Sequence, residues 1–192
     1  MSTSRPGPLH FESAASLARK VRRGEVTSER LTELFIRRIE ALDGPVNAIV
    51  VRCFEEARRR ARSLDRDLAR GAPVRGPLHG VPVTVKENND VAGLRTTLGD
   101  PARARGPAAA APSPAVRRLL EAGAVILGKT NLPLACNDVQ TYNPVYGATS
   151  NPHDVRRTPG GSSGGSAAAL CAGLTALELG GDKPGRRELR IL

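Results

Sequence analysis

The residues that could do chemistry are gathered in a glycine-rich stretch late in the chain. Residues 159–166 read PGGSSGGS, and the apolar run AAALCAGL follows over residues 167–174. Glycines let backbone and serine hydroxyl groups crowd a reacting group. A flexible Gly/Ser linker would stay polar, and a phosphate-binding loop would show G-x-G-x-x-G or G-x-x-x-x-G-K-[ST], neither of which occurs. The pattern favours a functional loop that leads into a buried helix.

A lysine stands at the end of a predicted strand. Residues 78–85 form an apolar run bounded by Gly76-Pro77 and by the polar residues 87–90, which is typical of a buried strand. Lys86 follows this run directly. Such a lysine is usually a solvated charge. The alternative is a chemical role, because α/β enzymes place reacting groups at the ends of buried strands.

The composition narrows the classes of function. The net charge is +10, but 25 of the 29 basic residues are arginine. That imbalance is as typical of a GC-rich coding sequence as of a nucleic-acid-binding protein. The chain shows neither aromatic residues interleaved with the basic ones nor a recognised nucleic-acid motif. Nucleic acid is therefore not an expected partner.

Cysteine and histidine residues are scattered along the chain. Cys53, Cys136 and Cys171 form neither a disulfide framework nor a zinc spacing, and the three histidines are spread just as widely. We therefore expect no metal site and no cofactor. The N-terminal residues lack the apolar segment of a secretory signal, and no apolar stretch is long enough to cross a membrane. These features predict a cytoplasmic protein with no membrane partner.

Helical and strand patterns alternate along the chain. The helices are expected over residues 13–23, 27–42, 54–70, 114–122 and 167–174, and the strands over 79–85, 124–127 and near 175–179. The second helix is expected to end at Asp43-Gly44, and residues 100–113 and 131–158 are expected to be loops. Helices that alternate with short buried strands indicate an α/β fold with helices on both faces of the sheet.

Three segments resemble a known family. Residues 159–182, PGGSSGGSAAALCAGLTALELGGD, resemble the core of the amidase signature family, serine hydrolases of carbon–nitrogen bonds that use a Ser, cis-Ser, Lys triad. Residues 80–97, GVPVTVKENNDVAGLRTT, resemble its lysine-bearing segment, and residues 122–133, AGAVILGKTNLP, resemble a third stretch. The matches occur in the family's order and cover about residues 10–182. They imply the N-terminal part of the amidase-signature fold, in which helices cover both faces of a mixed sheet. The fold is expected to be incomplete in this chain.

The resemblance also implies roles for individual residues. It makes Lys86 the base, neutral in the resting enzyme, and Ser162 the bridging serine held by a cis peptide. Ser163 beside it is an orienting hydroxyl. The further supporting positions are Gly160, Gly161, Gly164 and Asp182. Because burial is what keeps a lysine neutral, this mechanism requires a pocket around Lys86 that excludes water.

The chain departs from the family pattern where the nucleophile should stand. In the family, the aspartate is followed by a G-G-S-I-R-like turn whose serine attacks the carbonyl and whose N–H groups bind the oxyanion. Here Asp182 is followed by KPGRRELRIL, so Arg186 holds the nucleophile's place four residues later. Pro184 also lacks the backbone N–H of one presumed oxyanion donor. The nucleophile is therefore expected to be absent.

These observations divide the chain into three parts. Residues 1–70 are expected to form an N-terminal helical segment, 71–182 a partial amidase-signature core, and 183–192 an aberrant basic tail. A frameshift or premature end is the simplest account of the tail, and a shortened scaffold protein is the runner-up. The missing half of the fold would leave a strand edge and the face of the 167–174 helix exposed, which predicts self-association.

Three functions remain open at this point. The chain is expected to be an amidase-family hydrolase of carboxamide bonds by ancestry, with a small amide as substrate, and an inactive fragment as it stands. One alternative is a fragment of the glutamine-hydrolysing subunit of a tRNA amidotransferase. The other is a binding remnant without enzymatic activity.

Overall fold

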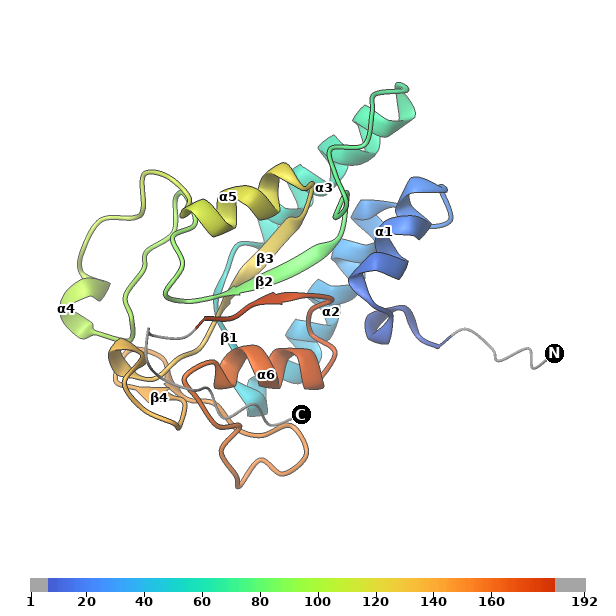
Figure 1. Cartoon of the computed structure of the whole chain (residues 1–192). Helices are drawn as coiled ribbons and strands as arrows, with labels where there is room; N and C mark the ends of the chain where they lie inside the picture. The colour runs from blue at the N-terminus through green and yellow to red at the C-terminus, as the bar shows by residue number, and fades with distance from the viewer. Residues whose placement is uncertain (1–6, 182–192) are drawn as a thin grey trace.

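A mixed four-stranded sheet runs through the protein in the order β1-β3-β2-β6 (Figure 1). The computed structural model describes residues 7–181. The strands are β1 (Ile49–Arg52), β2 (Pro82–Lys86), β3 (Val125–Thr130) and β6 (Glu178–Leu179). Strand β2 pairs in parallel with β3 and with β6, and β1 pairs antiparallel to β3. Every residue of β2 and β3 is buried, as expected for central strands covered on both faces.

Helices lie on both sides of these strands. They are α1 (Ala14–Arg22), α2 (Ser28–Val46), α3 (Phe54–Ala69), α4 (Pro101–Ala104), α5 (Pro114–Glu121) and α6 (Gly164–Cys171), with 3-10 turns at Leu9–Phe11 and Leu134–Cys136. Helix α6 runs along one side of the strands, and α3 and α5 run along the other (Figure 1). The predicted α/β class, with a mixed sheet between helices, is confirmed.

Helix α2 is longer than predicted. It continues through Gly44 and Pro45 to Val46 and ends at Asn47, which takes a left-handed conformation with φ 54°. The buried carboxylate of Asp43 accepts hydrogen bonds from the N–H groups of Ala48 (2.8 Å) and Ile49 (3.2 Å). The expected end at Asp43-Gly44 is wrong, because these bonds fix the chain beyond the helix.

Other boundaries differ by a few residues. Helix α6 begins three residues before the predicted start, at Gly164, and β2 includes Lys86 as its last residue. The predicted loop 131–158 contains a small hairpin, β4 (Tyr142–Asn143) and β5 (Gly147–Ala148). The predicted loop 100–113 contains the single turn of α4.

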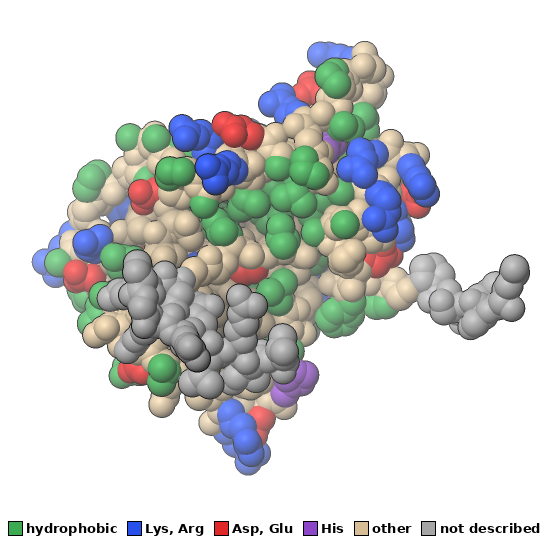
Figure 2. Space-filling model, viewed as in Figure 1, with side chains coloured by type: hydrophobic (Ala, Val, Ile, Leu, Met, Phe, Trp, Pro, Cys, Tyr) green, Lys and Arg blue, Asp and Glu red, His purple; other side chains and the backbone are tan. Residues whose placement is uncertain are grey.

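One face of the molecule shows apolar side chains gathered where β2 and β6 lie (Figure 2). Within residues 7–181, β6 pairs with β2 alone, so its other edge has no partner strand there. The predicted self-association remains a prediction.

None of the described helices is both long enough and apolar enough to span a bilayer.

Candidate active site

Lys86 and the two consecutive serines meet in the interior of the protein. The Lys86 side chain is completely buried, and Ser162 is 4% exposed. Lys86 Nζ lies 2.7 Å from Ser162 Oγ, 2.8 Å from Ser163 Oγ and 2.5 Å from the Gly181 carbonyl oxygen. A charged lysine would donate all three bonds, whereas a neutral one would donate two and accept the third from a hydroxyl. This arrangement is therefore compatible with proton transfer between Ser162 and Lys86.

The fold brings these groups together from distant parts of the chain. Lys86 is the last residue of β2, and Ser162 and Ser163 directly precede α6, which packs against β2 and β3. The Gly161–Ser162 peptide bond is cis. Side chains alternate along a strand, so Thr84 and Lys86 point to the same face of the sheet. The hydroxyl of Ser166 in α6 contacts Thr130 Oγ1 at 2.9 Å, which places this face under α6.

The glycines of the loop are needed for close approach. A Cβ on Gly161 would lie 3.0 Å from the backbone carbon of Val139, and a Cβ on Gly164 would collide with the Thr141 side chain. Thr141 Oγ1 donates to the Gly160 carbonyl (2.8 Å) and accepts from the Gly164 N–H (3.1 Å). One threonine thus holds the loop on both sides of the serines.

Glu178 is a polar residue of this site that the sequence analysis missed. Its carboxylate accepts hydrogen bonds from Thr130 Oγ1 (2.8 Å), Ser166 Oγ (2.9 Å) and the Thr84 hydroxyl. Burial raises the pKa of Glu178 to about 7, and these hydrogen bonds and the charge of Lys86 oppose the rise.

The raised pKa of Glu178 makes stability depend on pH. Between pH 4.5, the ordinary value, and about pH 7, the unfolded chain loses this proton while the folded protein keeps it, so stability falls as the pH rises. Glu178→Gln should remove this loss. As the pH rises from 5 to 8, the free energy of unfolding of the variant, measured with urea, should increase by up to about 3 kcal/mol relative to that of the parent. Glu40→Gln, at an exposed position of α2, is the matched control. If the variant instead becomes less stable relative to the parent as the pH rises, the folded protein favours the ionised carboxylate of Glu178.

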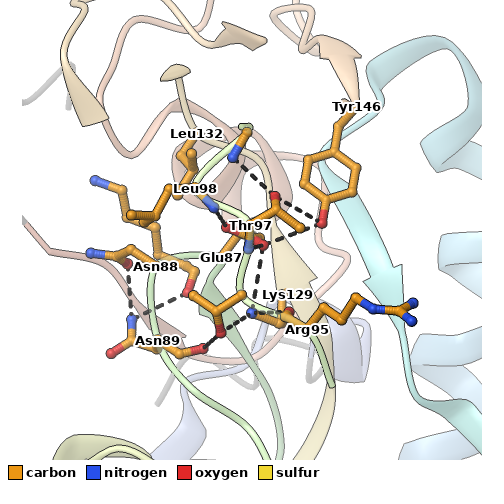
Figure 3. Close-up of polar contacts among 12 residues, drawn as sticks. Glu87, Asn88, Asn89, Arg95, Thr97, Leu98, Lys129, Leu132 and Tyr146 are labelled. Atoms are coloured by element: carbon orange, nitrogen blue, oxygen red, sulfur yellow. Dashed lines mark hydrogen bonds and ion pairs between the residues drawn. The ribbon is translucent and has the colours of Figure 1, made fainter. Parts of the chain in front are cut away.

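A second buried network lies beside the first and contains an ion pair (Figure 3). The side chains of Glu87 and Lys129 are both fully buried, with Nζ 3.7 Å from Oε1. Lys129 Nζ donates to the Arg95 carbonyl (2.7 Å) and to Thr96 Oγ1 (2.9 Å). Burial lowers the pKa of Lys129, and the charge of Glu87 opposes this. The pair ties β3 to the segment that follows Lys86.

The carboxylate of Glu87 has further partners. It accepts hydrogen bonds from the backbone N–H groups of Thr97 (2.6 Å) and Leu98 (2.8 Å) and from the Tyr146 hydroxyl (3.2 Å). Burial raises the pKa of Tyr146 to about 12, so this hydroxyl keeps its proton and can donate it in a hydrogen bond. The network fixes the position of Glu87, the residue next to Lys86. The sequence contains one signal that could have revealed this network, which is Lys129 inside the apolar run 124–130.

Part of the predicted site lies beyond the described residues. Asp182, Pro184 and Arg186 belong to residues 182–192, so the nucleophile's place and the oxyanion turn are outside the described structure. Of the predicted site residues within the described part, Lys86, Ser162 and Ser163 are in direct contact, and Gly160, Gly161 and Gly164 surround the serines. Residues 7–181 contain no group of three or more side chains arranged to hold a metal ion.

The described part of the site is thus a fully buried lysine in contact with two serines at the entry to α6, on an α/β sheet. Comparison with known proteins identifies the family. The family model described as Amidase matches residues 30–185, so the chain belongs to the amidase family. It is 45% identical over 180 residues to a putative amidase, AmiB2, of Mycobacterium tuberculosis, and 42% identical over 180 residues to one subunit of the glutamyl-tRNA(Gln) amidotransferase of Moorella thermoacetica.

Solved structures of the family agree with the fold. A bacterial aryl acylamidase of the amidase signature family superimposes with a TM-score of 0.83 at 33% identity, covering 88% of this chain and 35% of that one. A peptide amidase from Stenotrophomonas maltophilia gives 0.81 at 36% identity, covering 88% and 36%. The two curated relatives match 94% and 92% of this chain, which spans only 38% and 36% of their length.

Proposed function

We propose that this chain carries the proton-transfer half of an amidase active site, built for the hydrolysis of a carboxamide C–N bond. The observation that supports this most strongly is the contact of the fully buried Lys86 Nζ with Ser162 Oγ at 2.7 Å. Close contact between the relay hydroxyl and its base is the geometry that such a reaction needs. Membership of the amidase family agrees with this chemistry.

The proposed relay moves one proton in each direction. A nucleophilic hydroxyl gives its proton to Ser162 Oγ as it attacks the carbonyl, and the Ser162 proton passes to the neutral amine of Lys86. The proton returns along the same path to the departing amine when the C–N bond breaks. Ser163, 2.8 Å from Nζ, holds the amine in place.

The chain as it stands should not complete this reaction. The sequence has Arg186 where the family has its nucleophile, and Pro184 lacks an N–H. We expect the purified chain to release no ammonia or amine above background from a panel of aliphatic and aromatic amides. Turnover that disappears in Lys86→Ala would contradict this, and Ser163 and Ser166 would then be the first candidates for the attacking group.

A second candidate function is hydrolysis of glutamine as part of a tRNA amidotransferase. The 42% identity to the glutamyl-tRNA(Gln) amidotransferase chain favours it, whereas the 45% identity to AmiB2 favours a plain amidase. Both functions would use the same relay, so they differ in substrate and partner. Glutamine therefore belongs in any panel of amides given to a form of the protein with a complete nucleophile turn. Selective hydrolysis of glutamine would favour the amidotransferase.

A further inference from the structure

A second pair of nucleophile and base lies at the other end of α6. Cys171 is the last residue of this helix, and its Sγ lies 2.9 Å from His153 Nε2. Both side chains are exposed. The hydroxyls of the candidate active site stand at the beginning of the same helix, so this pair is separate from the amidase chemistry. An imidazole in contact with a thiol can take its proton and leave a thiolate, the reactive form of cysteine.

The loop that carries His153 is held by its own contacts. The backbone N–H of His153 donates to Asn151 Oδ1 at 2.9 Å, and Asn151 forms a β-bridge with Asp154. Asp154 also pairs with Arg156 at 2.9 Å. The bridge closes a tight turn that contains His153, and the imidazole of this turn contacts Cys171 at the end of α6.

A hollow beside the pair provides room for a ligand. Its volume is about 490 Å³, and both Cys171 and His153 line it. The other walls are mainly apolar and include Pro152, Pro159, Ala167 and Leu170. A soft sulfur nucleophile in an apolar hollow fits a small, uncharged electrophile better than a charged one.

The other two cysteines offer no such setting. Burial raises the pKa of the Cys53 thiol to about 12, and this thiol donates to the Ile126 carbonyl. Cys136 is 5% exposed. A thiol that is buried or holds its proton this tightly is a poor nucleophile at neutral pH. The chain therefore contains two internal controls for the reactivity of Cys171.

We propose that Cys171 and His153 form a covalent modification site for small apolar α,β-unsaturated carbonyl compounds. The thiolate adds to the β-carbon, the S–C bond forms, and the C=C π bond breaks. The proton that His153 took from the thiol ends on the α-carbon. Thiol and electrophile combine into one product, and no oxidant or reductant is needed.

The test measures the rate of adduct formation at each cysteine by peptide mass spectrometry, with 2-cyclohexen-1-one as the apolar probe and acrylamide as the polar one. Cys171 should react at least about tenfold faster than Cys53 or Cys136, and His153→Gln should slow it by about tenfold or more because the base is lost. Leu170→Asn alters a hollow wall but not the pair, and it should slow cyclohexenone more than acrylamide.

The same experiment can overturn the proposal. If His153→Gln leaves the Cys171 rate unchanged, exposure alone explains the reactivity and the imidazole is not a base. Equal slowing of both probes by Leu170→Asn would show that the hollow does not select apolar electrophiles. Circular dichroism of each variant verifies that the fold is intact, and no step of the test depends on amidase activity.

Discussion

Lys129→Met should lower the free energy of unfolding by about 3–5 kcal/mol, because it leaves the fully buried Glu87 without its ion-pair partner. Glu87 would keep its hydrogen bonds from Thr97 and Leu98, but these satisfy a carboxylate only in part. Urea unfolding followed by circular dichroism measures the loss. The double variant Glu87→Gln/Lys129→Met should recover much of it, since no uncompensated charge then remains in the interior.

Lys20 provides the matched control for this prediction. It pairs with Glu12 at 2.6 Å, but both side chains reach solvent, with 24% and 14% exposed. Pairs of this kind contribute at most about 1 kcal/mol, so Lys20→Met should cost little. If Lys129→Met costs no more than Lys20→Met, the buried pair does not anchor the segment after Lys86.

The second large effect is on catalysis in a repaired protein. Residues 183–192 would be replaced by the nucleophile turn and the remaining C-terminal part of the M. tuberculosis relative, with which this chain shares 45% identity. We expect the chimaera to hydrolyse simple amides. Lys86→Ala and Ser162→Ala should each lower kcat/KM by about 10²–10⁴-fold, the range for loss of a positioned acid or base.

Controls separate this result from a general loss of structure. Lys20→Ala removes a lysine from α1, far along the chain from the candidate site, and should leave kcat/KM unchanged. Circular dichroism should show the same fold in every variant. A folded chimaera that hydrolyses amides as well with Lys86→Ala as without it would contradict the proposed base.

Local patterns in the sequence predicted most of the elements that position the site. The apolar run before Lys86 indicated a strand, and β2 ends at that residue. Ser13 and Thr27 were predicted to begin helices, and their side chains accept the N–H groups of Ser16 and Arg30 as caps. Ser113 stands directly before α5 at its N-cap position, but its hydroxyl makes no such bond.

The polar networks could not be predicted because they join residues that are far apart in the chain. Glu178 meets Thr84 across 94 positions, and this contact depends on the register between β6 and β2. The Tyr146 hydroxyl likewise meets the Glu87 carboxylate across 59 positions. Hydrophobic periodicity and amino-acid composition do not indicate which charged side chains a sheet will bury together.

The roles of Lys86 and Ser162 came from family resemblance rather than from spacing. The sequence alone left Lys86 between a solvated charge and a chemical role. Its complete burial excludes the solvated charge. The catalytic roles of Lys86 and Ser162 remain a prediction.

A double-mutant cycle in the chimaera tests the relay most directly. The measurement is kcat/KM for the parent, Lys86→Ala, Ser162→Ala and the double variant. If the two groups pass one proton as a unit, the double variant should lose about as much as the worse single variant. Losses that add in free energy would mean that Lys86 and Ser162 act independently and would contradict the shared relay.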